Sequence, residues 1–284
     1  MQLFVVGVVL FAALFHASWN AVLKTGSDTV LTTALITTAA SCIAALALPF
    51  LPAPAAQSWP YIAGSVALQF IYYTLLVRAY ACGDMSHTYP IMRGGAPLIV
   101  AALSASLVGE PLTAARWLGV GLICSGVLGL AIHRSASPGL TAHHAATGYA
   151  LANAAAIAAY TLVDGIGVRK SQAPASYTLW LFLLIGAARL TWTLLLRRRE
   201  LLVYLLRYWP QGLAGGVGTV SSYGLALWAM TIAPVALVAA LRETSILFAA
   251  VISALVLKER VTPMRIVSVV LIAAGAATLA AYRR

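Results

Sequence analysis

Long apolar segments separated by short polar ones make up most of the chain. A helix needs about 20 apolar residues to cross the hydrocarbon core of a bilayer, and these segments are too long, and alternate too little, to be barrel strands. The pattern therefore predicts an all-α integral membrane protein with about ten transmembrane helices, at residues 2–22, 31–51, 60–82, 86–108, 113–132, 147–168, 177–196, 210–232, 234–257 and 262–281.

Composition supports the membrane interpretation. Of the 284 residues, 62% are hydrophobic and only 9% are charged, and the mean hydropathy is +0.92. A soluble domain has about 25% charged residues, so the soluble classes are excluded and the lipid bilayer is the expected surrounding. The net charge of +11 fits basic loops at lipid headgroups. Nucleic acid is not an expected partner, because no basic segment is long enough to follow its backbone. The first apolar run lacks a preceding Lys or Arg, which favours an uncleaved helix over a signal peptide.

The two halves of the chain repeat each other. At an offset of 149 residues, Arg93 aligns with Arg242, and further pairs follow in order: Ser104 with Ser253, Glu110 with Glu259, Thr113 with Thr262, Arg116 with Arg265, and Gly126 with Gly275. At an offset of 150, Tyr73 aligns with Tyr223. We expect a first repeat at 1–132, a polar linker at 133–146 and a second repeat at 147–284. Because five helices per repeat is an odd number, the halves should be inverted, as in many secondary transporters.

The loops carry an unequal distribution of basic residues. Nine lie on the side of the 197–209 loop and five on the side of the termini. The positive-inside rule therefore predicts that the 197–209 loop is cytoplasmic and that both termini are outside.

The segment SHTYPIMRGGAPLI, residues 86–99, carries a charge and helix breakers within an apolar run. An arginine at bilayer depth costs at least about 2.5–3.5 kcal/mol and normally points at a cavity or a partner. Backbone groups freed by Pro90 and by Gly94 and Gly95 also need protein or water around them. A guanidinium can hold a carboxylate through two hydrogen bonds. Arg93 is therefore either a substrate anchor or a structural arginine paired with Glu243 or Asp164, and Arg242 is its weaker counterpart.

Aromatic and polar residues within the spans form a second set of candidates, because such residues at mid-membrane often line pockets. The set comprises Trp19, Asn20, Tyr72, Tyr73, Tyr89, Tyr160, Tyr223 and Trp228. Aromatic belts near helix ends are the alternative interpretation.

Coupled transport requires a group that carries a proton or an ion. The titratable candidates within the spans are His16, His87, Asp164 and Glu243. No acid lies within 2–22, which disfavours a cation exporter driven by a carboxylate in its first helix. The three cysteines lack metal-type spacing, and no enzyme motif is present, so we expect no metal site, no cofactor and no catalysis.

Glycines are concentrated in 113–132, with Gly119, Gly121, Gly126 and Gly129, and Gly275 follows in 262–281. Small residues let membrane helices approach closely. We therefore expect close packing at these faces, either within one half of the chain or across a homodimer.

Several segments carry a family resemblance: FHASWNAVLK (15–24), YPIMRGGAP (89–97), GEPLT (109–113), ALRETS (240–245) and LKERVT (257–262). They resemble the drug/metabolite transporter superfamily, in its EamA-type branch, over nearly the whole chain. The resemblance implies a ten-helix carrier with inverted repeats, often an exporter of small metabolites, with both termini cytoplasmic. The loop charges predict the opposite orientation.

These features favour a secondary transporter in the cell membrane that exports a small polar metabolite, plausibly an amino acid or another zwitterion or anion, by alternating access. A multidrug or cation exporter on the same scaffold is the first alternative, and a membrane scaffold without transport is the second. The arginines within the spans favour anionic or zwitterionic cargo.

Overall fold

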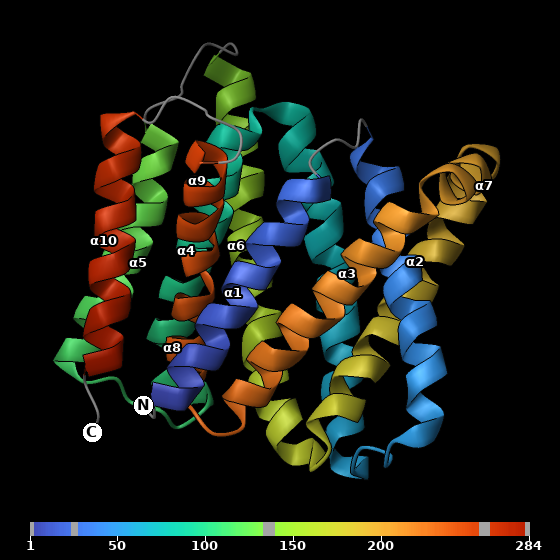
Figure 1. Cartoon of the computed structure of the whole chain (residues 1–284), viewed down its shortest axis with the longest axis horizontal. Coiled ribbons are helices and arrows are strands. Elements are labelled where there is room, and N and C mark those ends of the chain that lie inside the picture. Colours follow the sequence, from blue (N-terminus) through green and yellow to red (C-terminus); the bar gives the residue numbers. More distant parts are fainter. Residues whose placement is uncertain (1–2, 24–27, 133–139, 256–261, 282–284) are drawn as a thin grey trace.

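The computed structural model is a helical bundle (Figure 1) and describes residues 3–23, 28–132, 140–255 and 262–281. No strand occurs among these residues. The helices are α1 (Leu3–Leu23), α2 (Thr29–Ala47), α3 (Trp59–Cys82), α4 (Met85–Leu107), α5 (Ala114–Ile132), α6 (Leu140–Ser171), α7 (Pro174–Met230), α8 (Val235–Arg242), α9 (Thr244–Leu255) and α10 (Pro263–Ala281), with 3-10 turns at Leu48–Phe50 and Ala56–Ser58.

Local signals explain several helix starts. Asp28 precedes α2, and its Oδ1 accepts hydrogen bonds from the backbone N–H groups of Val30 and Leu31 at 2.9 and 3.0 Å. This is a side-chain N-cap, which satisfies N–H groups that have no partner within the helix. Proline occupies the first turn of α3 and of α7, where its missing N–H costs nothing. Asp28 also forms an ion pair with Arg197 at 2.8 Å, which ties the start of α2 to α7.

The prediction of a loop at 197–209 is wrong. Helical structure continues through this segment, and α7 spans 57 residues with two breaks, at Arg197 (φ −141°, ψ 43°) and Tyr208 (φ −115°, ψ 19°). Figure 1 shows the two long arms of α7 diverging from a turn at the edge of the bundle. Charged residues in the segment hid its helical character in the hydropathy pattern, although Arg197 pairs with Glu200 along it.

Two other expected boundaries also shift. Helix α6 begins at Leu140, within the expected linker, while 133–139 lies outside the described residues. The expected span 234–257 is divided at Glu243 into α8 and α9. This break places a carboxylate between two helices, where the sequence pattern suggested an uninterrupted span.

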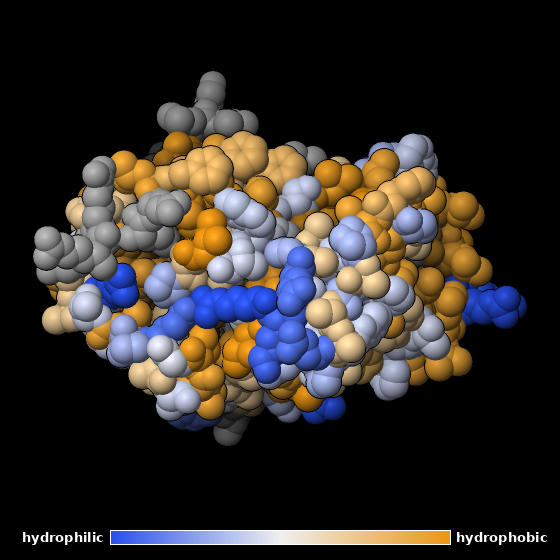
Figure 2. Space-filling model, turned by 90° about the horizontal axis from the view of Figure 1, so that it is seen from below, coloured by the Kyte–Doolittle hydropathy of each residue, from blue (hydrophilic) through white to orange (hydrophobic). Residues whose placement is uncertain are grey.

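The bundle has the surface of a membrane protein. Seven of the described helices are long and apolar enough to cross a membrane, and Leu3–Ser18 is a shorter apolar helix. Large hydrophobic side chains lie exposed along their outer faces, including Phe4, Phe11, Leu118, Trp192 and Val270. Figure 2 views the end of the bundle where α1 begins and α10 ends, and there hydrophilic residues form a band flanked by hydrophobic ones. The chain is therefore a multi-pass membrane protein.

Helix α8 occupies the middle of the bundle. All of residues 235–241 are buried, and α8 contacts α1, α4, α5, α6 and α7. Around it, α2 packs on α7, α3 on α6, α5 on α10, and α4 on both α5 and α6. Because Arg242 and Glu243 directly follow this buried segment, their side chains are held in the interior.

The expected close packing at glycines occurs between α5 and α10. A Cβ atom built on Gly126 would lie 2.7 Å from the carbonyl oxygen of Ser268, and one on Gly275 would lie 2.6 Å from that of Gly119. Such contacts are too short for any side chain, so the glycines are needed for this approach. The contact joins the two halves of the chain, whereas packing within one half was expected, and a homodimer stays a prediction.

Candidate functional site

Arg93 is paired with an acid. Its Nε lies 2.9 Å from Oε2 of Glu243, and the side chains are 14% and 6% exposed. Of the two acids that the sequence offered as partners, Glu243 is the one found, and the role of Arg93 as a substrate anchor stays a prediction. The two residues come from opposite halves of the chain, and they place an ion pair between α4 and the α8–α9 break.

The local backbone around Arg93 also differs from expectation. Helix α4 is continuous from Met85 to Leu107, with Pro90 and Pro97 inside it. Gly94 is pressed against Leu128 of α5, and a Cβ atom on Gly95 would lie 3.3 Å from Cβ of Ala154 in α6. The two glycines therefore let α4 approach its neighbours, and this packing fixes the direction in which Arg93 points.

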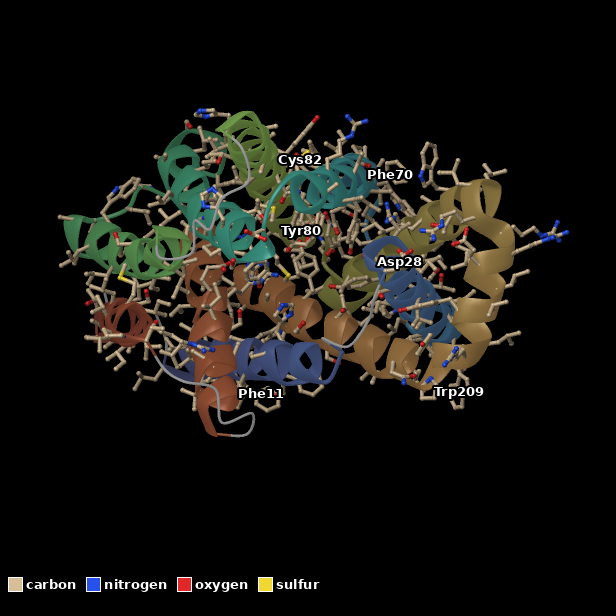
Figure 3. All side chains as sticks on the ribbon, turned by 90° about the horizontal axis from the view of Figure 1, so that it is seen from above. Phe11, Asp28, Phe70, Tyr80, Cys82 and Trp209 are labelled. Atoms are coloured by element: carbon tan, nitrogen blue, oxygen red, sulfur yellow. The ribbon has the colours of Figure 1, made fainter. Side chains whose placement is uncertain are left out.

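Tyrosines surround the ion pair. Tyr72, Tyr89 and Tyr160 are close enough to Arg93 for their charge states to influence one another. The Tyr72 and Tyr160 ring centroids are 5.8 Å apart, and the Tyr72 and Tyr73 centroids 4.8 Å. Figure 3 shows Tyr80 inside the bundle, whereas Phe11 and Trp209 lie on its outer side. The site therefore combines a charge pair with ring faces and hydroxyl groups.

A second charged cluster adjoins the first. Asp164 of α6 is fully buried, and it accepts hydrogen bonds from the Tyr223 hydroxyl at 2.5 Å and the Tyr177 hydroxyl at 3.0 Å. The Arg242 guanidinium carbon lies 4.8 Å from the Tyr223 ring centroid. The Tyr160 and Tyr223 rings, with centroids 6.4 Å apart, connect the two clusters.

The structure therefore brings together most of the predicted residues: Arg93, Arg242, Glu243, Asp164, Tyr73, Tyr89 and Tyr223. His16 lies near them, with Nδ1 3.5 Å from the Ser222 hydroxyl.

Other predicted residues lie elsewhere or are not described. The Trp228 ring packs edge-on against Phe4 of α1, with centroids 6.1 Å apart, near the end of the bundle where α1 begins. His87 lies 3.1 Å from the Thr147 hydroxyl, near the first turn of α4. The side chains of Trp19 and Asn20 lie outside the described ones, although their backbone belongs to α1.

Two residues of the interior were given no role by sequence reasoning, although Arg189 was expected to lie within the membrane. Tyr177 gave no periodic or motif signal, and its contact with Asp164 exists only in the folded chain. Arg189 of α7 is 4% exposed, and its guanidinium carbon lies 5.1 Å from the Tyr73 ring centroid and 5.9 Å from that of Phe70. Its position within an apolar span is the signal that identifies it, by the same reasoning that identified Arg93.

Glu110, which follows α4, connects the end of α6 to the start of α8. Its Oε1 lies 2.6 Å from Nη2 of Arg169, and its Oε2 accepts the Val235 N–H at 2.8 Å, at the start of α8. Arg169 also donates to the carbonyls of Met230 and Ala233. Glu110 thus does more than end a helix, because it fixes the turn that leads into α8. Within the described parts of the chain, no group of three or more His, Cys, Asp or Glu residues could hold a metal ion.

Comparison with known proteins agrees with this architecture. Residues 145–281 match the model of the EamA-like transporter family. A solved structure titled "Crystal structure of protein" is similar over 96% of this chain and 95% of its own length, with a TM-score of 0.69 and 20% sequence identity. No curated protein matches the chain. The structural similarity extends over both halves and establishes the fold.

Proposed function

Because residues 145–281 identify this chain as a member of the EamA-like transporter family, part of the drug/metabolite transporter superfamily, we propose that it is a secondary transporter of a small zwitterion. The observation that carries the proposal is the ion pair between Arg93 and Glu243 in the interior. An amino acid carries the same two charges in one molecule. Its carboxylate replaces Glu243 at Arg93 and its ammonium replaces Arg93 at Glu243, so that two ion pairs form where one is broken.

The surroundings of the ion pair suit such a ligand. The planar guanidinium can bind a carboxylate through two parallel hydrogen bonds. We propose that Tyr72, Tyr89 and Tyr160, which lie near Arg93, contact the side chain and the ammonium group of the ligand. The buried carboxyl of Asp164, held by two tyrosine hydroxyls, is the group we propose to carry a coupling proton.

Alternating access requires two related halves, and the α5–α10 contact supports inverted repeats at 1–132 and 147–284. Under the offset of 149, the contact of Gly126 with Ile272 becomes the contact of Gly275 with Ile123, and both occur. Similarly, the approach of Gly126 to Ser268 becomes that of Gly275 to Gly119. In Figure 1, α1 rises from the end of the bundle to which α6 descends, as expected for inverted halves. We propose export as the direction, in line with the family resemblance.

A ligand-induced thermal-shift screen of the purified protein tests this function, because a ligand that binds the folded state stabilises it by mass action. Each amino acid is compared with its amine-free acid and its carboxyl amide. We expect stabilisation by zwitterions and loss of that stabilisation in Arg93→Ala. Stabilisation by cationic drugs alone would instead favour the multidrug alternative, for which the two interior carboxyls, Asp164 and Glu243, are the supporting observation.

A further inference from the structure

The charges that point into the bundle do not balance among the described residues. Arg93 is compensated by Glu243 at 2.9 Å. Arg242 is close enough to Asp164 to influence its charge, and the Tyr223 ring lies between them. Arg189 forms no ion pair with an acid among the described residues, and its guanidinium lies over the Phe70 and Tyr73 rings. One positive charge is therefore left over in the interior.

Burying Arg189 without an acid costs free energy. It is 4% exposed, and its Nε is buried without a hydrogen-bond acceptor among the described residues. A guanidinium has five N–H donors, and a buried donor without an acceptor costs about 1–3 kcal/mol. Ring faces offset a part of the charge but accept no full set of hydrogen bonds.

The position of Arg189 connects it with the central site. Tyr73 lies under the guanidinium and beside Tyr72, which is one of the rings near Arg93. The Arg189 guanidinium also lies over the Phe70 ring, which meets the exposed Trp192 ring edge-on with centroids 5.7 Å apart. Figure 3 shows Phe70 on the side of α3 that faces α7. The guanidinium thus lies over two rings of α3, and Tyr73 and Tyr72 connect it with the central site.

We infer that Arg189, with Tyr73 and Phe70, forms a distal subsite for a second anionic group, so that the preferred substrates are zwitterions with an acidic side chain. The α-amino group of the substrate binds Glu243 and its α-carboxylate binds Arg93. The side-chain carboxylate accepts hydrogen bonds from Arg189. This inference rests on the proposed function, because it assumes that the zwitterion binds at the central ion pair.

The test compares α-amino dicarboxylates of increasing length with their side-chain amides, for example glutamate with glutamine and 2-aminoadipate with its amide. The two members of a pair have the same shape and differ by one charge. We expect the protein to bind at least one acid about 10-fold or more tightly than its amide, as the loss of a charged hydrogen bond implies. Arg189→Met should abolish this preference without weakening binding of the amide, and Arg189→Lys should retain part of it.

The matched control is Arg78→Gln, which removes an exposed arginine from the neighbouring helix α3 and should leave the preference unchanged. Thermal stability provides a second readout. Arg189→Met leaves no acid unpaired, so its melting temperature should not fall. If Arg189 is purely structural, Arg189→Met should instead lower the melting temperature and leave the preference for acids over amides unchanged.

The outcomes separate this inference from the proposed function. Binding of amides and acids with equal affinity would overturn the distal subsite while leaving the central site intact. A preference for acids that persists in Arg189→Met would also overturn it. If neither member of any pair binds, or if Arg93→Ala leaves their binding unchanged, the central site fails and the subsite fails with it.

Discussion

Replacing Glu243 by glutamine should convert the central site from one that prefers zwitterions to one that prefers simple anions. The substitution preserves shape and removes the charge 2.9 Å from Arg93. In the unmodified protein, a carboxylate ligand must displace Glu243 before it reaches the guanidinium. In Glu243→Gln that competition disappears, and the ammonium of a zwitterion also loses its partner.

The structure sets the scale of the effect. The interaction of an ammonium with Glu243 is a charged hydrogen bond, worth about 1.5–3 kcal/mol. The ratio of zwitterion affinity to anion affinity should therefore fall by about 10- to 150-fold. The same variant leaves a buried guanidinium without its acid, which costs about 3–5 kcal/mol of stability when no ligand is present. Anions should restore part of this stability by binding to the guanidinium that has lost its partner.

The assay is calorimetric titration of the purified variant with alanine and with propionate, which differ by the amino group. The reciprocal variant, Arg93→Gln, should shift preference toward amines, and the double variant should be more stable than either single one because neither charge is left alone. Glu200→Gln, at an exposed position on α7, is the control. An unchanged affinity ratio together with reduced stability would refute the reasoning, since it would make the ion pair purely structural.

The remaining predictions concern coupling, packing and orientation. Asp164→Asn should retain substrate binding but remove the dependence of transport on a proton gradient, and a gradient-driven variant would contradict the proposed role of this carboxyl. Gly126→Leu should lower the melting temperature through overpacking of about 1–3 kcal/mol or more, whereas Gly121→Leu, at a position with open space beside it, should not; equal effects would contradict the α5–α10 contact. The loop charges predict that 197–209 faces the cytoplasm, so a cysteine replacing Arg198 should not react with impermeant thiol reagents added to intact cells. Labelling from outside would contradict the predicted orientation.

The sequence pattern predicted the membrane-embedded helices well because their signal is local. A run of about 20 apolar residues predicts a membrane-spanning helix whatever that helix contacts in the folded protein. The same pattern failed for 197–209, because a helix with charged faces outside the apolar core has no hydropathy signal to distinguish it from a loop. It also failed at Glu243, where a helix break occurs inside an apolar segment.

For the site, the cost of a charge in the membrane identified Arg93 and Arg242 correctly as interior residues. For Arg93 the same reasoning named Glu243 and Asp164 as possible partners but did not choose between them. The contact of Arg93 with Glu243 joins residues that are 150 positions apart, and the contact of Tyr223 with Asp164 joins α7 to α6 across 59 positions. Such contacts depend on the packing of α4, α6 and α8. Glycines and other small residues permit this packing, but their positions in the sequence do not predict which helices meet.

Counterflow in proteoliposomes tests the central claim most directly. Vesicles loaded with an unlabelled amino acid should take up the labelled form of the same compound transiently above its external concentration, since a carrier exchanges substrate without an external energy source. We predict this uptake for the unmodified protein, its loss in Arg93→Ala and its retention in Glu200→Gln. Equal uptake in the unmodified and the Arg93→Ala protein, or uptake of no zwitterion at all, would contradict the account.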